Sequence, residues 1–130
     1  MQPHHVGYLV RDMETAVAEF KRLGYSAVSA PTYDGYRDID ICFLENHGLR
    51  VELVMPASER SVVYGLLKKR GPGPYHICYE VDDLPSEAEL LRQRGYVPMG
   101  ESLPAPALRD VPAAFFFHLE MGIVELIARA

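Results

Sequence analysis

Apolar and polar residues alternate near the start of the chain and then recur at helical spacing. The segment from His5 to Val10 alternates, which predicts a strand with two different faces. An apolar stripe with helical spacing follows it, formed by Met13, Ala16, Val17, Phe20 and Leu23. Asp12 is a favoured N-cap for this helix, and Gly24 stands where a left-handed residue commonly ends one. The pattern predicts a strand followed by an amphipathic helix.

Three short strands are predicted after this helix, because apolar runs bounded by turn residues occur there. They lie near residues 26–30, 38–44 and 50–55. The first part of the chain therefore forms a β-α-β-β-β unit.

The same succession of elements occurs a second time. HHVGYLVRDMETAVAEFKRLGY from His4 aligns without a gap with YHICYEVDDLPSEAELLRQRGY from Tyr75. The identical pairs are His5 and His76, Tyr8 and Tyr79, Val10 and Val81, Asp12 and Asp83, Gly24 and Gly95, and Tyr25 and Tyr96. RVELVMP from Arg50 likewise resembles IVELIAR from Ile123, at an offset two residues longer. We therefore expect an α+β fold built from two tandem βαβββ units.

The expected boundaries follow from this repeat. The units span about 3–56 and 73–129 of a single domain, 1–130. Between them, residues 58–70 are predicted to form a connecting helix that buries Val62, Val63, Leu66 and Leu67. The turn GPGP at residues 71–74 ends this connection.

Composition agrees with a globular protein that has a core of its own. The chain is 48% apolar and 24% charged. It contains no apolar run long enough to cross a bilayer and no secretory signal pattern, so we expect a soluble, cytoplasmic protein that does not bind membranes. Cys42 and Cys78 lie in apolar runs without a metal-binding or redox spacing, and are expected to be buried thiols.

The net charge of −5 argues against binding of nucleic acid. One small basic cluster, Lys68 to Arg70, closes the predicted connecting helix. The helix dipole favours cations at that end in any protein, and the alternative is a contact with an anionic part of a substrate.

Four polar residues stand on the predicted strands in matching places of the two units. Strand alternation puts His5 and His76 on the face away from the helices, and Glu52 and Glu125 opposite their apolar neighbours. A buried, unpaired carboxylate costs several kcal/mol. An arginine, for which Arg37, Arg50 and Arg109 are candidates, would balance one such charge. Two glutamates with two histidines also satisfy a divalent cation, and the duplication of the set favours this metal site.

The segments HHVGYLVRDMETAVAEF, YHICYEVDD and the paired VEL runs resemble the vicinal oxygen chelate superfamily, above all its methylmalonyl-CoA epimerase and glyoxalase I branch. The resemblance covers nearly the whole chain. It implies a curved eight-stranded mixed sheet with outer helices around one divalent metal ion, Co, Ni, Mn, Zn or Fe. The implied metal ligands are His5, Glu52, His76 and Glu125. Dimers are common in this fold, so we also expect a homodimer.

The resemblance implies an isomerase, epimerase or lyase that stabilises the enolate of a small carbonyl substrate, such as an acyl-CoA thioester or a natural-product intermediate. The proton would be taken by a metal-bound glutamate, Glu125 or Glu52. In the epimerases an acidic residue of a Glu-Gln-Gly stretch is implicated as well. The matching place here reads Tyr33-Asp34-Gly35, so Asp34 is a third catalytic candidate, one position away, and an ordinary turn residue is the alternative.

Two other functions occur on this fold. A non-catalytic antibiotic-binding resistance protein commonly lacks the metal ligands, and the complete set of two histidines and two glutamates argues against it. An iron-dependent ring-cleaving dioxygenase normally uses two histidines and one carboxylate, and four protein ligands leave too few open positions on the metal.

Overall fold

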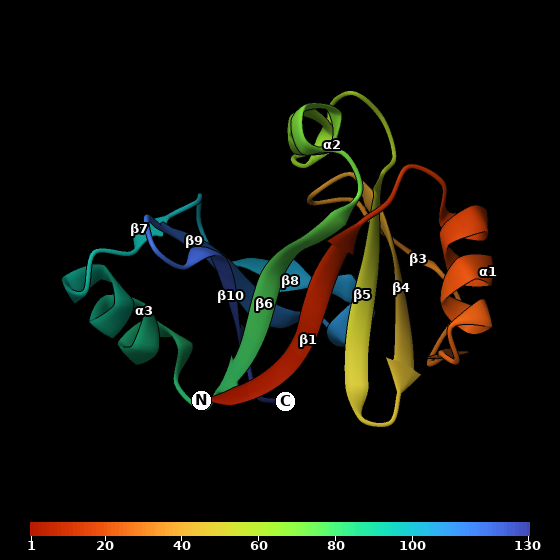
Figure 1. Ribbon diagram of the computed structural model, residues 1–130. Helices are drawn as coiled ribbons and strands as arrows, with labels where there is room; N and C mark the ends of the chain where they lie inside the picture. The colour runs from red at the N-terminus through yellow and green to blue at the C-terminus, as the bar shows by residue number, and fades with distance from the viewer. The chain divides into compact units, whose positions relative to one another are not determined.

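The computed structural model describes residues 1–130, which divide into two compact units. The N-terminal unit consists of residues 5–74, and the C-terminal unit consists of residues 75–130 together with residues 1–4. Each unit contains a sheet with a ten-residue helix packed on one face (Figure 1). None of the helices has the length and apolar character needed to cross a membrane.

The N-terminal unit has the sheet order β2-β4-β5-β1, with β3 paired to β4. Strand β1 runs parallel to β5, and the other pairs are antiparallel. Its elements are β1 (Gln2–Leu9), α1 (Met13–Arg22), β2 (Ser26–Ala27), β3 (Thr32–Asp34), β4 (Ile39–Asn46), β5 (Leu49–Pro56) and α2 (Tyr64–Arg70).

The C-terminal unit repeats this topology, with the order β6-β10-β9-β7 and β8 paired to β9. Here β6 runs parallel to β10, and the other pairs are antiparallel. Its elements are β6 (Gly73–Val81), α3 (Leu84–Gln93), β7 (Val97–Pro98), β8 (Leu103–Ala105), a 3₁₀ turn (Pro106–Leu108), β9 (Val111–His118) and β10 (Gly122–Ala128).

The α+β fold with two tandem units is confirmed, and the structure adds two strands to the expected eight. These are the three-residue strands β3 and β8, which lie outside the predicted strands. Tight turns fold each segment back along its long neighbour, with Asp34 opposite Ile39 and Ala105 opposite Val111. Backbone groups that a loop would leave to water are therefore paired within the sheet.

The helix ends match the expected capping residues. Asp12 accepts a hydrogen bond from the Thr15 amide at 2.9 Å, and Asp83 accepts one from the Ser86 amide at 3.1 Å. The hydroxyl and amide of Thr15 hold the pKa of the Asp12 carboxyl below its usual value. Gly24 and Gly95 follow the helices with φ of 97° and 89°. The predicted stripe of the first helix is one residue too long, because Leu23 is the C-cap residue and is 69% exposed.

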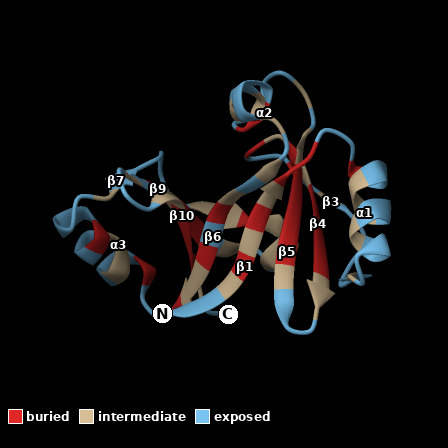
Figure 2. Cartoon of the chain, in the orientation of Figure 1, coloured by how far each residue is buried: buried red, intermediate tan, exposed pale blue.

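Each helix covers an apolar cluster on its own sheet. In the N-terminal unit the cluster joins Met13 of α1 to the buried side chains of Val10, Leu44, Val51 and Leu53. In the C-terminal unit Leu84 and Leu91 of α3 pack on Val81, Phe116 and Leu126. Figure 2 shows the buried residues concentrated in the middle of the long strands.

The connecting helix is shorter than predicted. Helix α2 begins at Tyr64 rather than near residue 58, and it belongs to the N-terminal unit. The preceding residues form turns instead, because Asp38 engages them: its carbonyl accepts from the Ala57 amide at 3.0 Å, and its carboxylate accepts from the Ser58 hydroxyl. Val63 and Leu67 are buried as expected, whereas Val62 is 67% exposed.

Candidate metal centre

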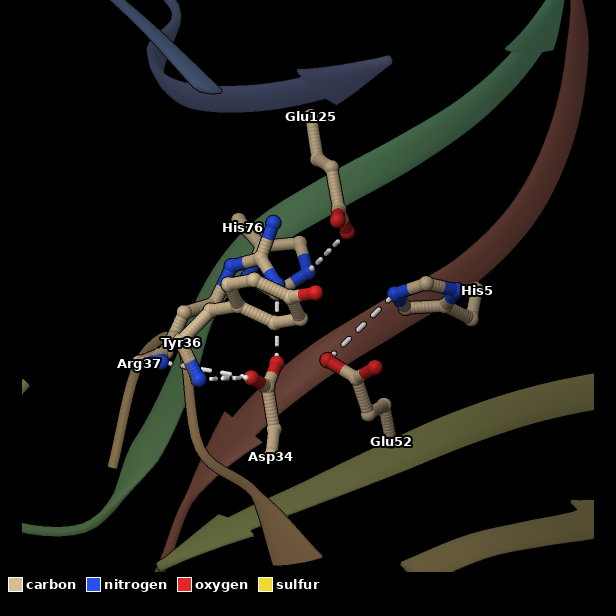
Figure 3. A network of polar contacts seen from close by, with 7 residues as sticks. All are labelled: His5, Asp34, Tyr36, Arg37, Glu52, His76 and Glu125. Atoms are coloured by element: carbon tan, nitrogen blue, oxygen red, sulfur yellow. Dashed lines mark hydrogen bonds and ion pairs between the residues drawn. The ribbon is translucent and has the colours of Figure 1, made fainter. Parts of the chain in front are cut away.

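The N-terminal unit holds one buried pair of polar side chains, His5 and Glu52. His5 lies on β1 and Glu52 on the parallel strand β5, where Glu52 stands opposite Gly7. Because residues 5 and 7 share a face of the strand, both side chains project from the side away from α1. The Nε2 atom of His5 lies 3.5 Å from Oε1 of Glu52, and the residues are only 3% and 6% exposed (Figure 3).

The C-terminal unit holds the matching pair, His76 and Glu125. Glu125 on β10 stands opposite Cys78 on the parallel strand β6, again two residues beyond the histidine. His76 Nε2 lies 3.1 Å from Glu125 Oε1 (Figure 3). These residues are 3% and 5% exposed. The shared face that strand alternation predicted for each histidine and glutamate is therefore present in both units.

A phenylalanine packs against the histidine of each pair. The ring of Phe43 meets His5 edge-on with centroids 5.2 Å apart, and the ring of Phe115 meets His76 in the same way at 5.2 Å. Phe43 stands opposite Glu52 in the strand register, and Phe115 stands opposite Glu125. At the offset that relates Glu52 to Glu125, Phe43 aligns with Phe116 rather than with Phe115, so the repeat did not predict the contact of these rings with the histidines.

The donor atoms of these pairs fit a transition-metal ion. Each histidine offers one ring nitrogen and each glutamate one carboxylate oxygen. Imidazole and carboxylate are ligands that Mn, Fe, Co, Ni and Zn all accept. Burial would make two carboxylates beside neutral imidazoles costly without a balancing positive charge. The donor chemistry of both units is thus compatible with a bound divalent cation.

Asp34, the third catalytic candidate, lies at the end of β3 and is 1% exposed. Its Oδ1 atom accepts hydrogen bonds from the amides of Tyr36 at 2.9 Å and Arg37 at 3.2 Å. Its Oδ2 atom forms an ion pair with Nη1 of Arg37 at 2.8 Å (Figure 3). The turn predicted for this segment is present, and a buried ion pair that the sequence did not indicate accompanies it.

The other arginines proposed as charge partners lie elsewhere in the strands and loops. Arg50 contacts Glu45 at 3.5 Å, at the end of the β4–β5 hairpin. Arg109 is exposed and follows the 3₁₀ turn with a φ of 58°.

Each unit also has an open cavity beside its helix. A cavity of about 570 Å³ lies between α1 and the segment after β2, lined by Met13, Val17, Ala30 and Met55 among others. A cavity of about 740 Å³ lies between α3 and the segment after β7. Because they occupy matching places, we attribute both to the way a helix packs on this sheet.

The chain is similar in sequence to known acyl-CoA epimerases. The chain is 29% identical to an ethylmalonyl-CoA/methylmalonyl-CoA epimerase of Cereibacter sphaeroides, over 95% of this chain and 94% of that protein. It is 27% identical to the human mitochondrial methylmalonyl-CoA epimerase, over 95% of this chain and 71% of the relative.

Solved structures agree in fold. A methylmalonyl-CoA epimerase from Mycobacterium tuberculosis superposes with a TM-score of 0.84 at 26% identity, covering 99% of this chain and 88% of the other. A hypothetical protein from Bacillus halodurans superposes with a TM-score of 0.86 at 22% identity, covering 99% and 94%. The model of the glyoxalase/bleomycin resistance protein/dioxygenase superfamily matches residues 4–115. This chain, with its duplicated fold and duplicated His–Glu pair, belongs to that superfamily.

Proposed function

We propose that this protein is a metal-dependent epimerase of an acyl-CoA thioester, one that moves a proton at the carbon next to the thioester carbonyl. The observation that carries the proposal is the buried His–Glu pair, which occurs with the same strand register in both units. Buried carboxylates in a sheet interior are costly unless a positive charge compensates them, and a cation bound by these side chains would supply that charge.

The relatives support the substrate class. The Cereibacter protein and the human protein are epimerases of acyl-CoA thioesters that carry a free carboxylate on the α-carbon. A solved methylmalonyl-CoA epimerase is in complex with methylmalonyl-CoA. The hydrogen between two carbonyl groups is acidic, so an enzyme that stabilises the resulting enolate can exchange it.

We further propose that His5, Glu52, His76 and Glu125 together hold one divalent cation. This set supplies two nitrogen and two oxygen donors. When bound, the cation would supply Lewis acidity that favours an enolate-like charge on the substrate. His5 and His76 would be held by their edge contacts with Phe43 and Phe115.

The proton itself requires a base within hydrogen-bond reach. We propose Glu125 or Glu52, because each carboxylate is buried and lies next to a histidine that would bind the cation. Return of a proton to the opposite face of the planar carbon, by the other glutamate in its protonated form, inverts the centre. Asp34 is a weaker base candidate, because three hydrogen bonds already occupy its oxygens.

The test is proton exchange at the α-carbon. Methylmalonyl-CoA and ethylmalonyl-CoA are incubated with the metal-loaded protein in D₂O, and loss of the α-proton is followed by NMR. We expect enzyme-dependent exchange, with kcat reduced about 100-fold or more in either Glu125→Gln or Glu52→Gln. Glu19→Gln, an exposed position on α1, serves as the matched control and should exchange at the normal rate.

Exchange that survives in both glutamine variants would remove the base role of these residues. No exchange with any acyl-CoA, together with tight binding of an antibiotic by the metal-free protein, would instead assign the chain to the binding proteins of its superfamily.

A further inference from the structure

A basic cluster at the end of helix α2 has no part in the metal centre. It consists of Lys68, Lys69 and Arg70 from the last turn of the helix, with Arg11 from the segment after β1. All four residues are exposed. Arg70 donates from Nη2 to the carbonyl of Pro74 at 3.2 Å. Arg11 approaches the same helix end, because a Cβ on Gly71 would lie 3.5 Å from its Nη2 atom.

The charge around this cluster is unbalanced. From Arg60 to Pro74 the chain carries four cations and no carboxylate, and the carboxylate of Asp12, next to Arg11, accepts hydrogen bonds from the amide and hydroxyl of Thr15. The whole acidic excess lies elsewhere, since residues 75–130 hold nine carboxylates and four cations. An anion that approaches this acidic protein therefore meets a local positive potential at the basic cluster.

The helix dipole alone does not account for the cluster. It favours cations in the last turn, but α2 has only seven residues and thus a small dipole, and Arg11 lies outside the helix. Arg11 and the end of α2 come from separate segments that meet at Gly71, an arrangement suited to a ligand with more than one negative charge. Lysine and arginine are the side chains that bind phosphate groups.

We propose that the basic cluster binds the phosphate groups of the CoA portion of the substrate, an inference that rests on the acyl-CoA substrate of the proposed function. Arg11 follows His5 by six positions, which corresponds to on the order of 20 Å of extended chain. A long pantetheine arm likewise separates the phosphates of CoA from its thioester. The cluster would hold the nucleotide end while the reacting carbon lies near the His–Glu pairs.

The test compares two matched double variants. Lys68→Ala/Lys69→Ala removes two cations from the end of α2, and Lys21→Ala/Arg22→Ala removes two from the end of α1. We expect the first to raise the Kd for CoA, measured by calorimetry, about tenfold at low salt, and the second to leave it unchanged. The difference should shrink as ionic strength rises. Equal Kd values for both variants and the unmodified protein would overturn the proposal.

Further ligands distinguish the source of the phosphate and separate this inference from the enzymatic one. Adenosine 3′,5′-bisphosphate should compete with CoA, whereas inorganic phosphate at the same concentration should not. A pantetheine thioester without phosphates should react equally well with the α2 variant and the unmodified protein. CoA binding that depends on Lys68 and Lys69 without α-proton exchange would retain the basic cluster and reject the epimerase. If the Lys68→Ala/Lys69→Ala variant instead exchanges the α-proton with a normal KM for acyl-CoA, the epimerase is retained and the role of the basic cluster is rejected.

Discussion

At the scale of the residue, Asp34 shows how one short side chain can be buried for structural reasons. It completes the turn after β3 through two backbone amides and neutralises Arg37, which is itself 8% exposed. The sequence suggested the turn, because aspartate before glycine is common there. The ion pair was not predictable, since a spacing of three residues outside a helix does not determine where an arginine side chain lies.

Replacement of Asp34 by asparagine should destabilise the protein while leaving the chemistry largely intact. The amide oxygen can still accept from the backbone, but Arg37 loses its charge partner, which costs about 2–3 kcal/mol. Urea denaturation measures this loss, and Arg37→Met combined with Asp34→Asn should recover part of it. A kcat reduced 100-fold or more in folded Asp34→Asn would instead identify Asp34 as a base.

At the scale of the element, the duplicated helices allow a comparison within one chain. Gly24 and Gly95 both follow their helices with positive φ, as the sequence predicted. Their surroundings differ. A Cβ on Gly24 would lie 3.2 Å from Nδ2 of Asn46, whereas a Cβ on Gly95 would meet only His118 atoms at 3.9 Å. The length of α2 was not predictable in the same way, because the hydrogen bonds of Asp38 to a distant segment decided it.

Alanine at these glycines should therefore destabilise the fold unequally. Gly95→Ala is expected to cost about 1 kcal/mol from the left-handed backbone alone, and Gly24→Ala about 2 kcal/mol because Asn46 must also move. Gly65→Ala in α2 is the control, because it has open space and no positive φ, and should be neutral or stabilising. Thermal unfolding of the three variants ranks their stabilities. Equal losses at the two glycines would show that Asn46 adapts at no cost.

At the scale of the whole molecule, the repeat provides one histidine and one glutamate from each unit. If the four side chains bind a single ion, each chain should take up one equivalent of divalent metal, and His5→Ala or His76→Ala should each abolish uptake. Metal in hundredfold excess over its Kd should stabilise the folded protein by about 2.7 kcal/mol. Metal analysis after dialysis and melting with and without chelator measure both effects. Two equivalents, or uptake by one histidine variant, would show that the pairs bind separately.

The sequence by itself determined the tandem βαβββ units, the helix caps and the face on which each His–Glu pair lies. These features depend on local periodicity and on strand alternation, and both patterns occur in each of the two repeated units. Only the tertiary structure decided the short strands β3 and β8, the start of α2, the Asp34–Arg37 pair and the ring contacts of Phe43 and Phe115. Each of these depends on partners distant in sequence or on side-chain directions in a turn, so no local pattern specifies it.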